Sequence, residues 1–157
     1  MTRKIWIDLI GLLLIALLIV VGYKLSPLLQ PQVDRSLPLA ACDLQQTACD
    51  LDLGGGARLH LDVGKRPVPL VQPFAVRLQV EGMAAKSAVL DFTGVDMNMG
   101  INRFDLQPAG AGLFEGSASL PVCVSGQMLW QLQVVIHSDR ERLAVPFRFV
   151  TGGPGHE

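Results

Sequence analysis

The chain has 157 residues and a formal net charge of −1, which is the size of one small domain with an additional segment. Its basic residues do not cluster, so the charge pattern gives no support for nucleic-acid binding. The sequence contains no phosphate loop, no paired-carboxylate signature and no serine or cysteine beside a suitable base. We therefore expect a protein that is not an enzyme.

The first predicted element is a membrane-spanning helix over residues 5–23. This run is apolar almost throughout, and as a helix of about 28 Å it matches the hydrocarbon core of a bilayer. Arg3 and Lys4 precede the run, whereas only Lys24 follows it closely. The positive-inside rule then predicts a single-pass protein of the inner membrane, with residues 1–4 in the cytoplasm and the C-terminal domain in the periplasm.

A cleaved signal peptide and a lipoprotein processing site are the two alternatives to a retained membrane span. A cleaved signal peptide usually has a shorter apolar run and a small-x-small site close behind it, which this sequence lacks. Residues 39–42, Leu-Ala-Ala-Cys, read like a lipoprotein processing box, but polar residues between 30 and 35 separate them from the apolar run. A retained span is favoured over both.

The next segment, residues 24–41, contains three prolines and few periodic apolar positions. Such a composition predicts a semi-extended stalk between the membrane and the folded domain. We place that domain at residues 42–150. Residues 151–157 are rich in glycine and are expected to be a disordered tail.

A cysteine pair opens the predicted domain. Cys42 and Cys49 lie in a polar segment, and in an oxidising compartment a local disulfide between them is the default expectation. Cys123 is then the odd thiol. Two alternatives remain open: Cys123 pairs with one of the other two, or Cys42 and Cys49 stay reduced and bind or transfer copper.

From residue 58 onward the pattern is that of strands. Apolar residues alternate with polar ones, which indicates strands with one buried and one wet face. Gly and Pro cluster between these runs and mark turns. The alternating runs lie near residues 58–63, 74–81, 88–92, 113–120, 127–137 and 142–149. About seven short strands predict an all-β fold, an immunoglobulin-like antiparallel β-sandwich preceded by one transmembrane helix.

Residues 94–130 carry most of the chemistry. Met97 and Met99 are two apart, so on a strand their thioethers would point to the same face, whereas Asn98 would point away. Ser125 and Gly126 fit a two-residue hairpin turn, which would place Cys123 opposite Met128 with Cβ atoms roughly 5 Å apart.

Soft sulfur ligands of this kind select Cu(I). The predicted ligand set is therefore Met97, Met99, Cys123 and Met128, with His60 or His137 as lower-ranked additions. The competing interpretation is that these sulfur side chains only fill the core, because Met and free Cys are among the residues most often buried.

A set of short features accompanies these candidates. They are the N-terminal apolar span, the Met-x-Met-Gly step at 97–100, the Gly-x-Phe-x-Gly strand at 112–116, and Gly126 followed by Trp130 in an alternating strand. Together they resemble the FixH/YtkA-like family of membrane-anchored periplasmic β-sandwich proteins, over residues 58–150. The resemblance implies a role in copper supply and in assembly of respiratory haem-copper oxidases. Cys123 and the Cys42/Cys49 pair depart from the family pattern.

The sequence thus predicts a membrane-anchored periplasmic Cu(I)-binding protein that acts in copper delivery or respiratory oxidase assembly. Expected partners are the inner membrane and a haem-copper oxidase subunit or another copper chaperone. One alternative is a metal-free structural or assembly subunit that docks on a membrane complex. Another is a thiol–disulfide partner that uses Cys42 and Cys49.

Overall fold

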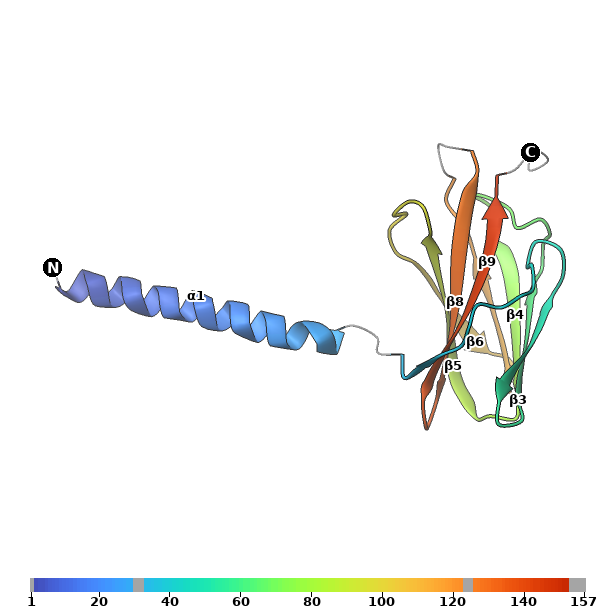
Figure 1. The fold of residues 1–157 in the computed structure, drawn as a ribbon, viewed down its shortest axis with the longest axis horizontal. Coiled ribbons are helices and arrows are strands. Elements are labelled where there is room, and N and C mark those ends of the chain that lie inside the picture. The colour runs from blue at the N-terminus through green and yellow to red at the C-terminus, as the bar shows by residue number, and fades with distance from the viewer. Residues whose placement is uncertain (1, 30–32, 123–125, 153–157) are drawn as a thin grey trace. The chain divides into compact units, whose positions relative to one another are not determined.

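The computed structural model describes residues 2–29, 33–122 and 126–152 (Figure 1). The chain divides into two compact units, residues 1–32 and 33–157, and each is described by itself. The first unit is a helix and the second is built of strands.

Helix α1 (Thr2–Leu29) contains the predicted apolar span. Its segment Trp6–Lys24 is long and apolar enough to cross a membrane. An N-terminal helix of this kind serves either as a single membrane span or as a signal sequence. The helix runs past the predicted end at residue 23 and through Pro27, whose missing N–H costs the helix one backbone hydrogen bond shortly before it ends.

The second unit contains nine strands. They are β1 (Arg35–Ser36), β2 (Cys49–Gly54), β3 (Ala57–Val63), β4 (Phe74–Glu81), β5 (Ala85–Gly94), β6 (Asn102–Pro108), β7 (Leu113–Ala118), β8 (Met128–Ser138) and β9 (Arg142–Thr151). Neighbouring strands follow the order β1-β9-β8-β5-β6-β7-β4-β3-β2. All neighbours are antiparallel except β1 and β9, which are parallel.

The nine strands form one sheet that curls at β6. The first part of β6, residues 102–106, pairs with β5, whereas Gln107 and Pro108 pair with β7. The β5–β8–β9 part of the sheet therefore stands beside the β3–β4 part, as Figure 1 shows. The core fills the space between them, from alternate residues of the strands.

The prediction of an all-β domain behind one apolar helix is confirmed in that coarse form. A seven-strand immunoglobulin-like sandwich is not what the chain forms, because β6 joins both halves into a single sheet. The six alternating runs predicted from the sequence are all strands. The strands missed are β2, β6 and β1, the last of which has two residues and therefore no period to detect.

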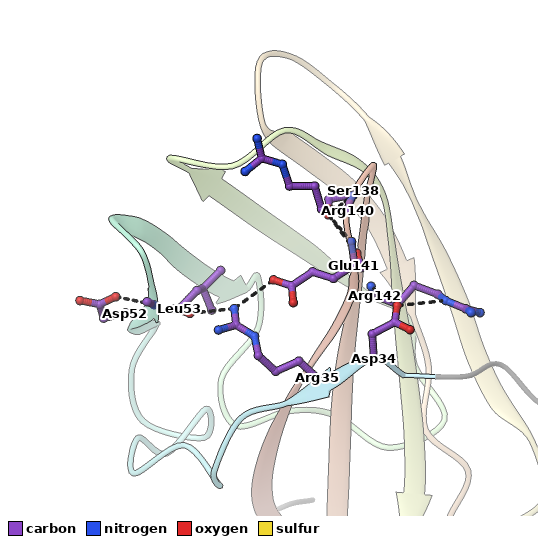
Figure 2. Close-up of polar contacts among 9 residues, drawn as sticks. Asp34, Arg35, Asp52, Leu53, Ser138, Arg140, Glu141 and Arg142 are labelled. Atoms are coloured by element: carbon purple, nitrogen blue, oxygen red, sulfur yellow. Dashed lines mark hydrogen bonds and ion pairs between the residues drawn. The ribbon is translucent and has the colours of Figure 1, made fainter.

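Residues 33–40 do not form a free stalk. The Asp34 N–H donates to the carbonyl of Arg142 at 3.0 Å, and the N–H groups of Leu37 and Ala40 donate to carbonyls of β9 at 2.9 Å each. The Asp34 carboxylate also accepts the Arg142 N–H at 2.7 Å (Figure 2). The edge of β9 that faces away from β8 offers this segment backbone partners that composition alone does not reveal. Residue 151 likewise ends β9 rather than opening the tail, and residues 153–157 lie outside the described part.

Phe92 of β5 lies at the centre of the core. Its ring makes edge-to-face contacts with Phe74, Phe104 and Phe149, at centroid distances of 6.4, 6.0 and 6.4 Å. These partners come from β4, β6 and β9, so one side chain contacts both halves of the curled sheet. Aromatic pairs of this geometry add to the free energy of burial.

We expect Phe92→Ala to lower the free energy of unfolding by about 3–5 kcal/mol, because it leaves a cavity and removes three aromatic contacts. Phe104→Ala removes a partly buried ring with one of these contacts and should cost less than half as much. Guanidinium unfolding followed by the fluorescence of Trp130, in a Trp6→Phe background, measures both. Equal losses for the two variants would show that Phe92 has no central role.

Candidate metal site

The segment between β5 and β6, residues 95–101, is a loop rather than a strand. Two side chains shape it: Asn98 accepts the N–H of Gly100 at 2.9 Å, and Asn102 donates to the carbonyl of Met99 at 3.0 Å. Gly100 has a φ of +74°, a conformation that residues with a Cβ rarely adopt. The positions of Met97 and Met99 are therefore set by loop geometry, not by the strand periodicity that predicted a common face for them.

The methionines gather around Gly94, the last residue of β5. A Cβ at Gly94 would lie 2.0 Å from Cε of Met128 and 3.3 Å from Cγ of Met99, so both side chains converge on the space that the glycine leaves. The backbone carbonyl of Met97 lies 2.3 Å from the same point. Two of the four predicted ligands are thus neighbours, and a third belongs to the same loop.

The three methionines differ in their access to solvent. Met128 is 5% exposed, Met99 is partly buried against the core and Met97 is 46% exposed. Residues 93–100 line a surface hollow of about 330 Å³. Exposure to solvent therefore decreases from Met97 through Met99 to Met128.

The predicted hairpin between residues 123 and 128 includes residues 123–125, which lie outside the described part of the chain. Strand β8 already has a partner on each edge, β5 and β9, and Met128 lies opposite Thr151. Strand β7 pairs with β4 and β6 in the other half of the sheet, so the connection to β8 crosses between the halves. The described strands β7 and β8 are not neighbours in the sheet, and the placement of Cys123 opposite Met128 stays a prediction.

The lower-ranked histidines lie elsewhere. His60, on the outward face of β3, has its Nδ1 2.7 Å from Oδ1 of Asp50. His137 pairs with Arg142 near the far end of β8 from Met128. Among the residues that the structure describes, no three His, Cys, Asp or Glu side chains are grouped so as to hold a metal ion. Any metal site here would thus depend on thioethers.

Cys42 and Cys49 form the disulfide predicted as the default, with Cα atoms 5.9 Å apart. This prediction is confirmed. The pair lies at the same end of the sheet as the start of β8, because Cys49 opens β2 opposite Leu61 near the end of β3.

Comparisons with known proteins give no family for this chain. No family model and no curated protein matches it. One solved structure, of an engineered protein, has 15% sequence identity and a TM-score of 0.40 over 57% of this chain and 19% of its own. The chain thus spans about a fifth of that protein, and the likeness carries no argument.

Gly94 is the residue that sequence reasoning missed. It was noted as the start of the methionine-containing stretch, but a glycine at a strand end usually signals a turn. In the structure, it makes room for Met99 and Met128. Only the fold, which places the end of β5 beside the start of β8, makes that role visible.

Gly94→Ala should displace Met128 and the loop, because the new methyl group would meet Cε of Met128 and the rigid carbonyl of Met97. We expect a loss of about 1–3 kcal/mol in the free energy of unfolding. Gly110→Ala is the matched control, since its Cβ would meet Leu113 at an ordinary 3.8 Å. Denaturant unfolding of both variants tests this, and equal stabilities would contradict the crowding at Gly94.

Proposed function

We propose that the protein is a membrane-anchored Cu(I)-binding protein that acts in copper delivery or in assembly of a respiratory oxidase. The observation that carries the proposal is the convergence of Met99 and Met128 on Gly94, with Met97 in the same loop. Two of the chain's five methionines thus bring their side chains together, and the backbone carbonyl of a third, Met97, lies beside them. Core packing alone gives no reason for an exposed Met97 beside them.

The chemistry of the donors suits Cu(I). Thioethers are soft ligands that need no deprotonation, so Met97, Met99 and Met128 can hold the ion at any physiological pH. Cys123 is proposed as a fourth ligand, because its thiolate would add charge and affinity. It stands five residues before Met128 in the sequence, although its own position lies outside the described residues.

The graded exposure of the methionines supports a role in delivery. A partner that offers its own thiolates can approach at the exposed Met97 and take the ion by ligand exchange. The hollow lined by residues 93–100 is open to such a partner.

We also propose a location and partners for the protein. The apolar segment Trp6–Lys24 supports a single-pass anchor. Arg3 and Lys4 before it favour a cytoplasmic N-terminus, an inner-membrane location and a periplasmic β domain. The resemblance to the FixH/YtkA-like family supports a haem-copper oxidase subunit or another copper chaperone as the partner.

A second function is favoured by a different observation. Large apolar side chains are exposed in the loops at the end of the sheet where β8 begins: Val71 by 69%, Ile101 by 91% and Val122 by 58%. Exposed apolar groups at one end of a domain suit protein docking. The chain would then be a metal-free structural or assembly subunit of a membrane complex.

A Cu(I) titration of the detergent-solubilised full chain, kept reduced and anaerobic against a chromogenic chelator, separates the two functions. We expect tight, stoichiometric uptake by the native chain. The double variant Met97→Leu/Met99→Leu should bind at least about tenfold more weakly, equivalent to about 1.4 kcal/mol. Leucine keeps the apolar volume, so stability should change little.

Met83→Leu is the matched control, because Met83 is also a partly buried methionine but precedes β5 at the opposite end of that strand. It should bind copper like the native chain. Absence of uptake at micromolar copper, or unchanged uptake in the double variant, would rule out this site and leave the docking function. A soluble fragment for such work has to begin at Val33 or earlier, because Asp34 and Arg35 pair with β9.

A further inference from the structure

The curled sheet has two outer strands, β1 and β2, and these are not paired with each other in the described residues. Residues 37–48 run from one of these edges to the other. The gap between the edges, which we call the seam, is bridged by side chains instead of a strand ladder. Closure of the seam therefore depends on a few polar contacts.

Arg35 bridges the seam at the end where the chain enters the β unit. Its Nη2 donates to the carbonyl of Leu53 in β2 at 3.1 Å and pairs with Oε1 of Glu141 at 3.1 Å (Figure 2). Glu141 lies in the turn between β8 and β9, so this one guanidinium joins both sides of the seam. These charge-assisted contacts keep this end of the seam closed even when the opposite end opens.

Gln45 bridges the seam at the opposite end. Its Oε1 accepts the N–H of Val68 at 2.7 Å, and its Nε2 donates to the carbonyl of Val150 at 2.6 Å. Val68 belongs to the loop between β3 and β4, whereas Val150 belongs to β9. One amide side chain thus ties together two segments from opposite halves of the sheet.

The Cys42–Cys49 disulfide positions Gln45. It closes the loop on both sides of this residue. Inside the loop, the carbonyl of Asp43 accepts the N–H groups of Gln46 and Thr47 at 3.0 and 3.1 Å. Leu44 is fully buried in the core. Without the disulfide, the loop gains chain entropy when it opens, and only the turn and the buried side chain of Leu44 oppose that opening.

The two cysteines of the disulfide differ in their exposure to solvent. Cys49 is fully buried as the first residue of β2, whereas Cys42 is partly exposed. An external thiolate therefore approaches the Cys42 sulfur, and Cys49 is the leaving group. The ladders of β2 to β9 do not include residues 42–48, so opening this loop leaves the rest of the sheet paired.

We propose that the Cys42–Cys49 loop is a redox-controlled clamp on the seam, opened by a protein dithiol and closed again by exchange with a protein disulfide, which takes the two electrons back and becomes a dithiol. A thiolate of the dithiol attacks Sγ of Cys42, the S–S bond breaks, and Cys49 leaves and takes up a proton. The second thiolate of the dithiol then displaces Cys42, which is protonated in turn. The dithiol departs as a disulfide, and two electrons and two protons have passed to the two cysteines.

The clamp also reaches the methionine site. Val150, held by Gln45, directly precedes Thr151, and Thr151 lies opposite Met128 and accepts a hydrogen bond from Trp130 Nε1 at 3.0 Å. Opening the clamp releases the Val150 carbonyl from Gln45 beside the start of β8, while the β8–β9 ladder stays paired. We therefore expect reduction of the disulfide to weaken copper binding. This expectation rests on the proposed function, whereas the clamp itself does not.

Amide hydrogen exchange of the full chain in detergent tests the clamp, with dithiothreitol as the dithiol and a Cys123→Ser background to prevent disulfide exchange. The Val68 N–H is a direct reporter because Gln45 is its partner, and the prolines at 67 and 69 contribute no amides nearby. We expect reduction to speed exchange at Val68 by on the order of tenfold or more, with residues 76–80 of β4 unchanged. A Cys42→Ser/Cys49→Ser variant should already exchange fast and not respond to dithiothreitol.

Gln45→Ala should reproduce the fast exchange at Val68 with the disulfide intact. Gln46→Ala is the matched control, since the Gln46 amide bonds only within the loop, to Asp43 at 3.2 Å, and should leave Val68 protected. Unchanged exchange at Val68 after complete reduction, or fast exchange throughout β3 and β4, would overturn the clamp. Copper titration of the same oxidised and reduced samples is separate: absence of uptake in both states refutes the copper function and leaves the exchange result standing.

Discussion

The structure depends on the change of partner along β6. Because residues 102–106 pair with β5 and the last two residues of the strand pair with β7, nine strands form one curled sheet instead of two separate ones. Curling brings the alternate apolar faces of both halves together, and Phe92 packs at their meeting point. The same curl leaves β1 and β2 as the two outer strands, each with one neighbour among the described residues. Unpaired edges invite association with other chains, so side chains and a disulfide-closed loop cover this seam.

The two ends of the sheet differ in the side chains that they expose. Where the chain enters, ion pairs predominate: Arg35 with Glu141, Lys86 with Asp139 and Arg142 with Asp34. At the other end lie the disulfide loop, the methionine loop and the exposed apolar side chains. Exposed ion pairs contribute little to stability but keep a surface soluble and free of apolar contacts. Arg66 and Asp62 form an ion pair at this second end as well, but only this end also offers soft ligands and apolar groups to a partner, among the residues that the structure describes.

Local pattern was a good guide to the strands and a poor guide to their neighbours. Alternation depends on residues two apart, so the strand containing Trp130 could be found from its own sequence. Which strands flank it depends on the whole topology, so its neighbours β5 and β9 could not be read from its own sequence. The disulfide was predictable because Cys42 and Cys49 are close in sequence. The role of Gly94 was not, since it arises from a contact with residues of another strand and a loop.

Met128 shows why core packing and metal binding need not exclude each other. Its side chain is almost fully buried, as a core residue should be, yet its methyl group lies in the gap above Gly94, beside Met99 and at the surface loop. A thioether is apolar enough to stay in a core and polarisable enough to bind a soft cation. Ligands already held by packing lose little conformational entropy when an ion arrives, so binding energy is not spent on ordering them. Burial of Met128 is therefore compatible with a preorganised soft site, and exposure of Met97 supplies the access that a buried ligand alone would lack.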